Sequence, residues 1–179
     1  MSTQIGYKEF LEDFRDTIVS AKARLSDISE AQSREKSSPD EWSAVEVLGH
    51  LIDSASNNHQ RFVRASFQDD LVFAGYDQDQ WVALQHYQEA PWEDLLTLWA
   101  SFNRHLARVM AATPTDVRRR ERRSHNLDRI AMRSVAAGSP ATLEYFMDDY
   151  VLHLHHHLRQ IREMCPGFKD PGPTRSSRM

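Results

Sequence analysis

Cysteine is almost absent from this 179-residue sequence, which contains Cys165 alone. One cysteine excludes a disulfide within the chain and a zinc site built from several thiolates. Proteins of a reducing compartment typically have this composition, so we expect a cytoplasmic protein. Glycine and proline are also scarce, with six and seven residues, which disfavours an all-β fold rich in turns.

Long hydrophobic runs and an excess of positive charge are missing as well. No apolar stretch approaches the roughly 20 residues that a membrane-spanning helix needs. The polar N-terminus does not have the pattern of a secretion signal. The 22 basic and 26 acidic residues give a net charge of −4, which disfavours general binding to nucleic acid. We therefore expect neither a membrane nor a nucleic acid as a partner.

The sequence does contain four long segments whose apolar residues recur every three or four positions, as on one face of an amphipathic helix. The second segment begins with a capping-box pattern at Ser43 and Glu46, and Ser139 is placed to cap the fourth. This pattern predicts an all-α fold, a four-helix bundle with long connections. The segments cover residues 7–29, 43–67, 91–113 and 139–165.

The connections and the C-terminal end differ in composition from these helices. The connection before the fourth helix contains a run at 118–123 of five arginines and one glutamate. Such a run can bind anions, although a solvated loop or the rim of a dimer is more frequent. Pro166 and Gly167 end the fourth helix. We expect one domain over residues 1–167 and a disordered tail over 168–179.

Histidine is abundant, with nine residues, and four of them fall between positions 153 and 157. On a helix His153 and His157 lie one above the other, so their imidazoles can bind one metal ion. A helical wheel places His157 in the apolar arc and His153 at its edge, whereas His155 and His156 point away. A purely structural role is the alternative, because histidine near a helix C-terminus interacts favourably with the helix dipole.

A metal site needs at least one further ligand, and periodicity does not select it. His50 lies away from the centre of its apolar arc, so the pattern alone predicts a surface residue. It can serve as a ligand only if the metal lies in a groove between helices, which the edge position of His153 permits. The remaining candidates are His59, His86, His105 and His125.

Two segments resemble the signatures of the DinB-like/YfiT-like superfamily of metal-dependent enzymes. They are WSAVEVLGHLID at 42–53 and DYVLHLHHHLRQ at 149–160. In that family a histidine of the second helix joins a His-x-x-x-His pair of a later helix, which carries over onto His50, His153 and His157. Many members read His-Arg-Gly-Gln after the last ligand. This chain keeps Gln160 but has leucine and arginine between.

The resemblance covers residues 7–165 and implies a helical bundle, often a homodimer, with one divalent ion in an open groove. It implies a metal-dependent enzyme for a small-molecule substrate, either a hydrolase or a transferase that uses a low-molecular-weight thiol. Zinc and nickel are the ions we expect first for imidazole ligands. The alternative is a non-enzymatic helical protein that keeps its metal for stability or binds a partner through the groove.

Three further residues are candidates for roles around the metal. Asp149 lies four residues before His153 and is placed to orient its ring, or else it is a solvated acid. Gln160 lies three residues after His157, where it either lines the groove or is a surface amide, the latter being slightly favoured. Asn103 lies on an inward row and needs partners, either at the site or between helices.

Overall fold

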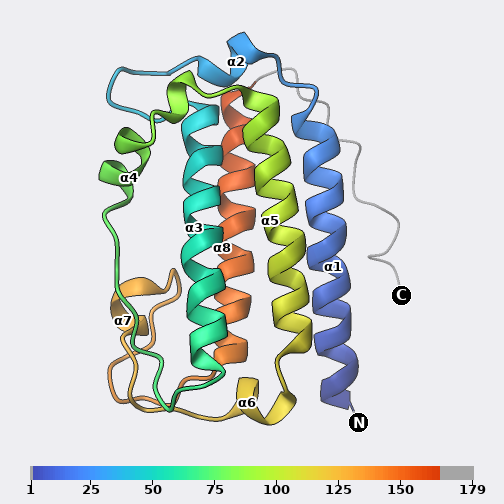
Figure 1. The fold of residues 1–179 in the computed structure, drawn as a ribbon, viewed down its shortest axis with the longest axis vertical. Helices are drawn as coiled ribbons and strands as arrows, with labels where there is room; N and C mark the ends of the chain where they lie inside the picture. Colours follow the sequence, from blue (N-terminus) through green and yellow to red (C-terminus); the bar gives the residue numbers. More distant parts are fainter. Residues whose placement is uncertain (1, 166–179) are drawn as a thin grey trace.

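The computed structural model of the chain describes residues 2–165. The expected disordered tail at 168–179 therefore lies outside the described residues. The predicted all-α four-helix bundle is confirmed (Figure 1). The four long helices are α1 (Ser2–Leu25), α3 (Ala44–Ala65), α5 (Trp92–Ala112) and α8 (Leu143–Met164). The connections hold α2 (Glu30–Arg34), α4 (Gln78–Leu84), the 3₁₀ helix η1 (Tyr87–Glu89), α6 (Thr115–Arg119) and α7 (Leu127–Ile130).

The directions of the helices explain the long connection between α3 and α5. In Figure 1, α1 and α8 run in one direction, and α3 and α5 run in the other. Helix α5 packs against both α1 and α3, while α3 also packs against α8. Because the neighbours α3 and α5 are parallel, the chain must return along the whole bundle between them. The segment 66–91 makes this return, and it covers one face of α3 with α4 and η1.

The starts of the helices follow local capping chemistry. Helix α3 begins at the predicted capping box, where Ser43 N–H and Oγ–H donate to Glu46 Oε2 at 2.8 Å each. The predicted cap of α8 at Ser139 is wrong, because Thr142 Oγ1 accepts the Tyr145 N–H at 3.1 Å. The cause is a short antiparallel bridge between Ala141 and Arg122, which keeps the chain extended before α8.

The arginine run is folded onto the bundle. Arg118 and Arg122 are each only 3% exposed, so the frequent reading of a solvated loop is wrong for both. Arg118 forms an ion pair with Glu144 of α8, and its guanidinium lies over the Tyr7 ring. Arg122 donates to the Ala65 carbonyl at the end of α3 at 3.0 Å. Among residues 2–165 no helix is both long and apolar enough to cross a membrane.

Candidate metal centre

His50 of α3 is buried by side chains from outside its own helix. Gly49 lets the Tyr87 ring lie directly on α3, since a Cβ at this position would lie 2.1 Å from a carbon of that ring. On the other side the Trp42 ring packs at 5.1 Å from the His50 ring. His50 is consequently 2% exposed, and its prediction as a surface residue is wrong. Helix periodicity missed this because none of the rings against His50 lies on α3: Trp42 precedes the helix, and two further imidazoles lie on α8.

Helix α8 places two imidazoles against His50. His153 Nε2 lies 3.2 Å from His50 Nε2 and 3.1 Å from His157 Nε2. The three residues form a group whose ligand atoms all lie within 4.8 Å of one another. We call these three side chains the three-His cluster. The structure thus brings together the three residues expected as ligands, and their role as ligands stays a prediction.

The three-His cluster is held in its neutral form. Burial, reinforced by the neighbouring His157, lowers the pKa of His50 to about 4. Burial, together with the surrounding imidazoles, lowers the pKa of His153 to about 3. Burial also lowers the pKa of His157, despite its hydrogen bond to Gln160. At neutral pH the rings are uncharged, and each offers a nitrogen lone pair as a metal needs.

The donor set fits a divalent cation. His157 Nδ1–H donates to Gln160 Oε1 at 2.8 Å, which leaves the His157 Nε2 lone pair directed at the cluster. His153 Nε2 lies within hydrogen-bond distance of two other ring nitrogens, and its single N–H or lone pair cannot form a full hydrogen bond with both. Ligand nitrogens about 2.0–2.1 Å from a tetrahedral ion lie about 3.3 Å apart. The observed separations of 3.1 and 3.2 Å come close to this spacing.

A cavity of about 440 Å³ opens beside the three-His cluster. One wall is a row on α3 at steps of three or four residues, in which His50 is followed by Ser54, Asn58 and Arg61. Helix α8 and the segment around α7 form the other walls. Three protein ligands at the edge of a cavity leave room for water and a substrate, as in catalytic zinc sites.

Gln160 is more than a surface amide. Its hydrogen bond to His157 fixes the orientation and tautomer of that ring, which is a common arrangement around metal-ligating histidine. The slight preference for a surface role is therefore wrong. On the opposite side of the cluster Ser54 Oγ lies 3.5 Å from His153 Nδ1. The sequence reasoning missed Ser54, although its position four residues after His50 places it on the same face of α3.

Asp149 is neither a solvated acid nor a partner of the His153 ring. It is 3% exposed, and its carboxylate accepts the backbone N–H groups of Met132 and Arg133 at 2.9 and 2.7 Å. The helical spacing suggested an orienting role because it could not show that the segment after α7 folds back onto α8. Asp149 instead ties this segment to the wall of the cavity.

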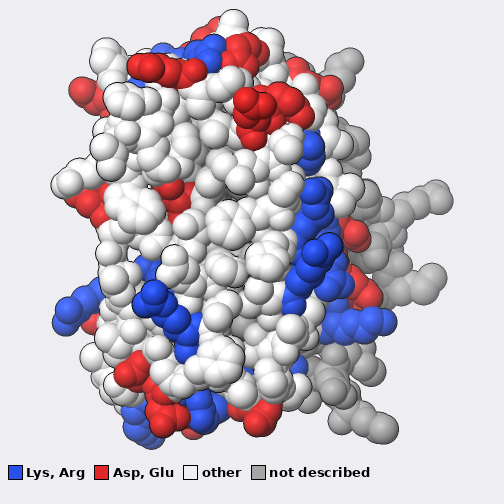
Figure 2. All heavy atoms as spheres, viewed as in Figure 1, with Lys and Arg blue, Asp and Glu red and all other residues white. Residues whose placement is uncertain are grey.

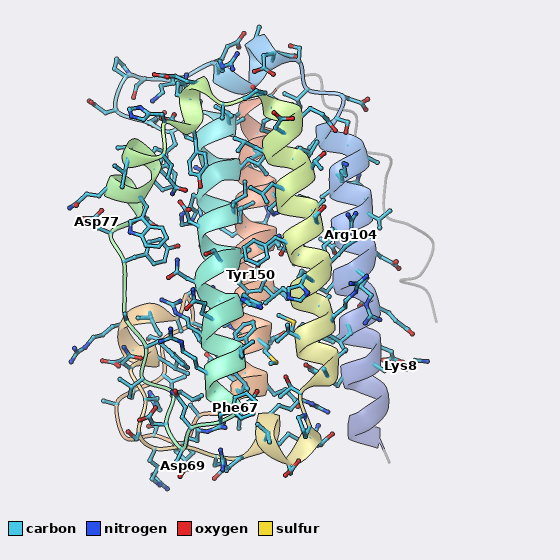
Figure 3. The ribbon with its side chains drawn as sticks, viewed as in Figure 1. Lys8, Phe67, Asp69, Asp77, Arg104 and Tyr150 are labelled. Atoms are coloured by element: carbon cyan, nitrogen blue, oxygen red, sulfur yellow. The ribbon has the colours of Figure 1, made fainter. Side chains whose placement is uncertain are left out.

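Asn103 bridges helices within the core. Its Oδ1 accepts the hydroxyl proton of Tyr150, which lies at the centre of the bundle (Figure 3), and its Nδ2 donates to the Trp99 carbonyl. Of the two alternatives for Asn103, a role at the site or a bridge between helices, the structure supports the bridge. His125 also has a structural role, since its Nε2 lies 2.8 Å from the Ser139 carbonyl. His155 and His156 are exposed, as the helical wheel predicts.

Comparison with known proteins agrees with this fold. A sequence profile described as the DinB superfamily matches residues 13–161. A protein of Oceanobacillus iheyensis, named as a candidate metal-dependent hydrolase, is 24% identical over 164 residues, covering 91% of this chain and 88% of its own. The structure is similar to that of YfiT from Bacillus subtilis, described as a probable metal-dependent hydrolase with an unusual four-helix bundle topology. The TM-score is 0.68 at 20% identity, covering 88% of this chain and 86% of YfiT.

Proposed function

Because the chain belongs to the DinB superfamily, we propose that it is a divalent-metal-dependent hydrolase whose ion is held by the three-His cluster. One observation carries the proposal. Three neutral Nε2 atoms from two helices converge at 3.1 and 3.2 Å on the edge of a 440 Å³ cavity. The names of the two similar proteins support the same reaction class.

Each side chain at the proposed metal centre has a distinct role. When bound, a divalent cation supplies Lewis acidity, which lowers the pKa of a water molecule or a thiol and polarises a carbonyl oxygen. His50, His153 and His157 hold the ion while neutral, so protons do not compete for their lone pairs at neutral pH. Gln160 keeps the His157 ring turned toward the ion. Zinc and nickel remain the ions we favour, because imidazole suits both.

A thiol-dependent transferase is the second reaction that this donor set supports, since the same ion would favour a thiolate. An assay of the zinc-loaded protein with ester and amide panels, with and without low-molecular-weight thiols, separates the two. We expect hydrolysis without thiol, lost in His153→Ala and retained in His105→Ala, whose side chain is exposed on α5. Turnover that requires a thiol would identify a transferase and overturn the hydrolase.

A metal kept only for stability is the non-enzymatic alternative. A structural ion contributes free energy of folding directly, so its removal lowers the melting temperature strongly. The core of this bundle is formed by large side chains that are not part of the cluster, including Phe14 and Trp99, both at most 1% exposed. We therefore expect the metal-free protein to remain folded. Unfolding on chelation, together with no turnover of any panel, would favour the structural role.

We also propose that the protein is a homodimer. The face over α3 and α5 carries few charged side chains, which gather at the ends of the bundle and along its edge (Figure 2). Val63 and Leu98 are 36% and 49% exposed on these helices, and Phe67 follows α3 at 88% (Figure 3). Light scattering measures the mass in solution. A mass of two chains that falls to one in Leu98→Glu is the expected result, and a monomer at all concentrations contradicts it.

A further inference from the structure

Arg61 stands out among the residues that line the cavity. It is 7% exposed. Its Nη2 donates to the Ala74 carbonyl at 2.9 Å, and its guanidinium carbon lies 5.9 Å from the centre of the Phe146 ring. It forms no ion pair with a carboxylate of the described part of the chain. Buried arginines usually pair with an anion, because a lone buried charge is costly.

The other two buried arginines of the described residues make their contacts away from the cavity. Arg118 is paired with Glu144, and Arg122 binds the carbonyl that ends α3. Neither lines the cavity, whereas Arg61 does. The one carboxylate in the cavity wall, Asp149, is already engaged by two backbone N–H groups and by Arg133. Arg61 therefore has no internal counter-ion available across the cavity.

Asn58 gives a second and independent sign of a ligand. This side chain is 6% exposed and lines the same cavity. Its Nδ2 donates to the Ser54 carbonyl at 2.9 Å, which fixes the amide orientation, and its Oδ1 is buried with no hydrogen-bond partner. A buried acceptor without a donor is costly, so a ligand N–H or O–H at this point is favoured.

We propose that the substrate carries a carboxylate that binds Arg61 and a hydrogen-bond donor that binds Asn58. This proposal rests on the function proposed above, since it places the reacting group of the same molecule at the three-His cluster. Guanidinium binds carboxylate through two parallel hydrogen bonds, which gives both affinity and orientation. The cavity thus recognises the charged end of the substrate, and the metal centre acts on the opposite end.

The helix geometry sets the length of this substrate. Ser54 faces His153 across α3 and α8, and Arg61 faces Phe146. Ser54 and Arg61 are seven residues apart on α3, and Phe146 and His153 are seven residues apart on α8. Seven residues of helix span about 10 Å at 1.5 Å per residue. Asn58 lies between Ser54 and Arg61 on α3. The substrate is accordingly an elongated small carboxylic acid, with its acyl group about 10 Å from the carboxylate and a donor between.

Binding of simple acids to the zinc-loaded protein tests this without relying on turnover. Linear dicarboxylates of increasing length, including suberate, are compared by calorimetry with monocarboxylates of equal length, such as octanoate for suberate. One carboxylate can bind the metal end and the other Arg61. We expect a dicarboxylate whose ends are about 10 Å apart to bind at least tenfold more tightly than its monocarboxylate. Alkyl phosphates of matched length are measured in parallel, and they test the alternative that Arg61 binds a phosphate group.

The decisive variant is Arg61→Gln, with Arg64→Gln as its matched control. Arg64 lies three residues further on the same helix and is exposed, and its Nη2 donates to Gln60 Oε1. Arg61→Gln should abolish the tenfold tighter binding of the dicarboxylate, while the variant still binds one zinc per chain and keeps its helical circular dichroism signal. Arg64→Gln should retain the tighter binding of the dicarboxylate. An advantage that persists in Arg61→Gln with zinc bound overturns the proposal, as does tighter binding of the alkyl phosphates. Failure of the unmodified chain to bind zinc would instead overturn the proposed function.

Discussion

Two groups of histidines join neighbouring helices in this protein, and only one has the properties of a metal centre. The three-His cluster joins α3 and α8, while His59 and His105 join α3 and α5 with ring centroids 5.1 Å apart. In the pair His105 is exposed, and the nearest further ring to His59 is that of Phe102, at 5.8 Å. The cluster has a third imidazole, a buried position and an adjoining cavity.

The contrast shows that helical proximity of imidazoles does not by itself make a site. Burial lowers the pKa of each ring in the cluster and also the pKa of His59, which the neighbouring His105 lowers further. In the cluster this lowering comes with Nε2 atoms aimed at a common point. In the pair two tilted rings lie against an apolar side chain. A third converging donor is therefore the feature that separates a metal centre from a surface contact.

The largest effect is expected from removing the histidine shared by both short contacts. His153→Ala should weaken zinc binding at least a thousandfold, about 4 kcal/mol, because it deletes the ligand that faces the other two. Competition with a chelator of known affinity measures this change. The matched variant His105→Ala, in the surface pair, should leave the affinity within twofold. Equal losses in the two variants would erase the distinction between the groups.

The effect of zinc on the free energy of unfolding should also distinguish the two groups of histidines. A ligand that binds only the folded state stabilises it by about 4 kcal/mol at a thousand times its dissociation constant. Denaturant unfolding of the parent chain and His59→Ala should show this gain with zinc, and His50→Ala should lose most of it. A gain that survives in His50→Ala would mean that zinc binds elsewhere on the chain.

Removing the support of one ligand should have an intermediate effect. Gln160→Ala deletes the acceptor that orients His157 and should weaken zinc binding about 10–100-fold. Gln160→Glu retains an acceptor and should restore most of the affinity. The neighbouring exposed Arg159, replaced by alanine, is the control. Unchanged affinity in Gln160→Ala would show that packing alone holds the His157 ring.

The smallest effect concerns the pH dependence of the metal-free protein. The folded pKa of His50, about 4, lies below its ordinary value of 6.5, so the unfolded state binds more protons between these values. Stability is then present above about pH 6.5 and is lost as the pH falls toward 4. His50→Asn should reduce the loss between pH 7.5 and 5.5 by about 1 kcal/mol in denaturant unfolding. An unchanged slope would mean that His50 is not buried in solution.

The sequence predicted those parts of the site that depend on spacing within one helix. His153 and His157 follow from a separation of four residues, and the capping box at Ser43 follows from local chemistry. It could not predict the burial of His50, because the rings that lie against it, Trp42 and the two imidazoles of α8, come from outside α3. Packing between helices thus decides which histidine side chains come together.

The errors around the site have the same physical origin. Asp149 has the spacing of an orienting carboxylate, but the segment after α7 supplies its partners. Arg61 looks like an ordinary helix arginine in the sequence, and only the return of residues 73–76 along α3 buries it. The regular row of His50, Ser54 and Asn58 is a signal that could have identified the cavity wall.

The measurement that tests the central claim most directly is elemental analysis of tag-free protein purified without a nickel column. The parent chain should contain about one divalent ion per chain, as one three-ligand site requires, and His50→Ala and His157→Ala should each lose it. His59→Ala should retain the ion, because the surface pair is not a site. A parent chain that holds no ion even after incubation with zinc, or full occupancy in both cluster variants, would contradict a metal centre at the three-His cluster.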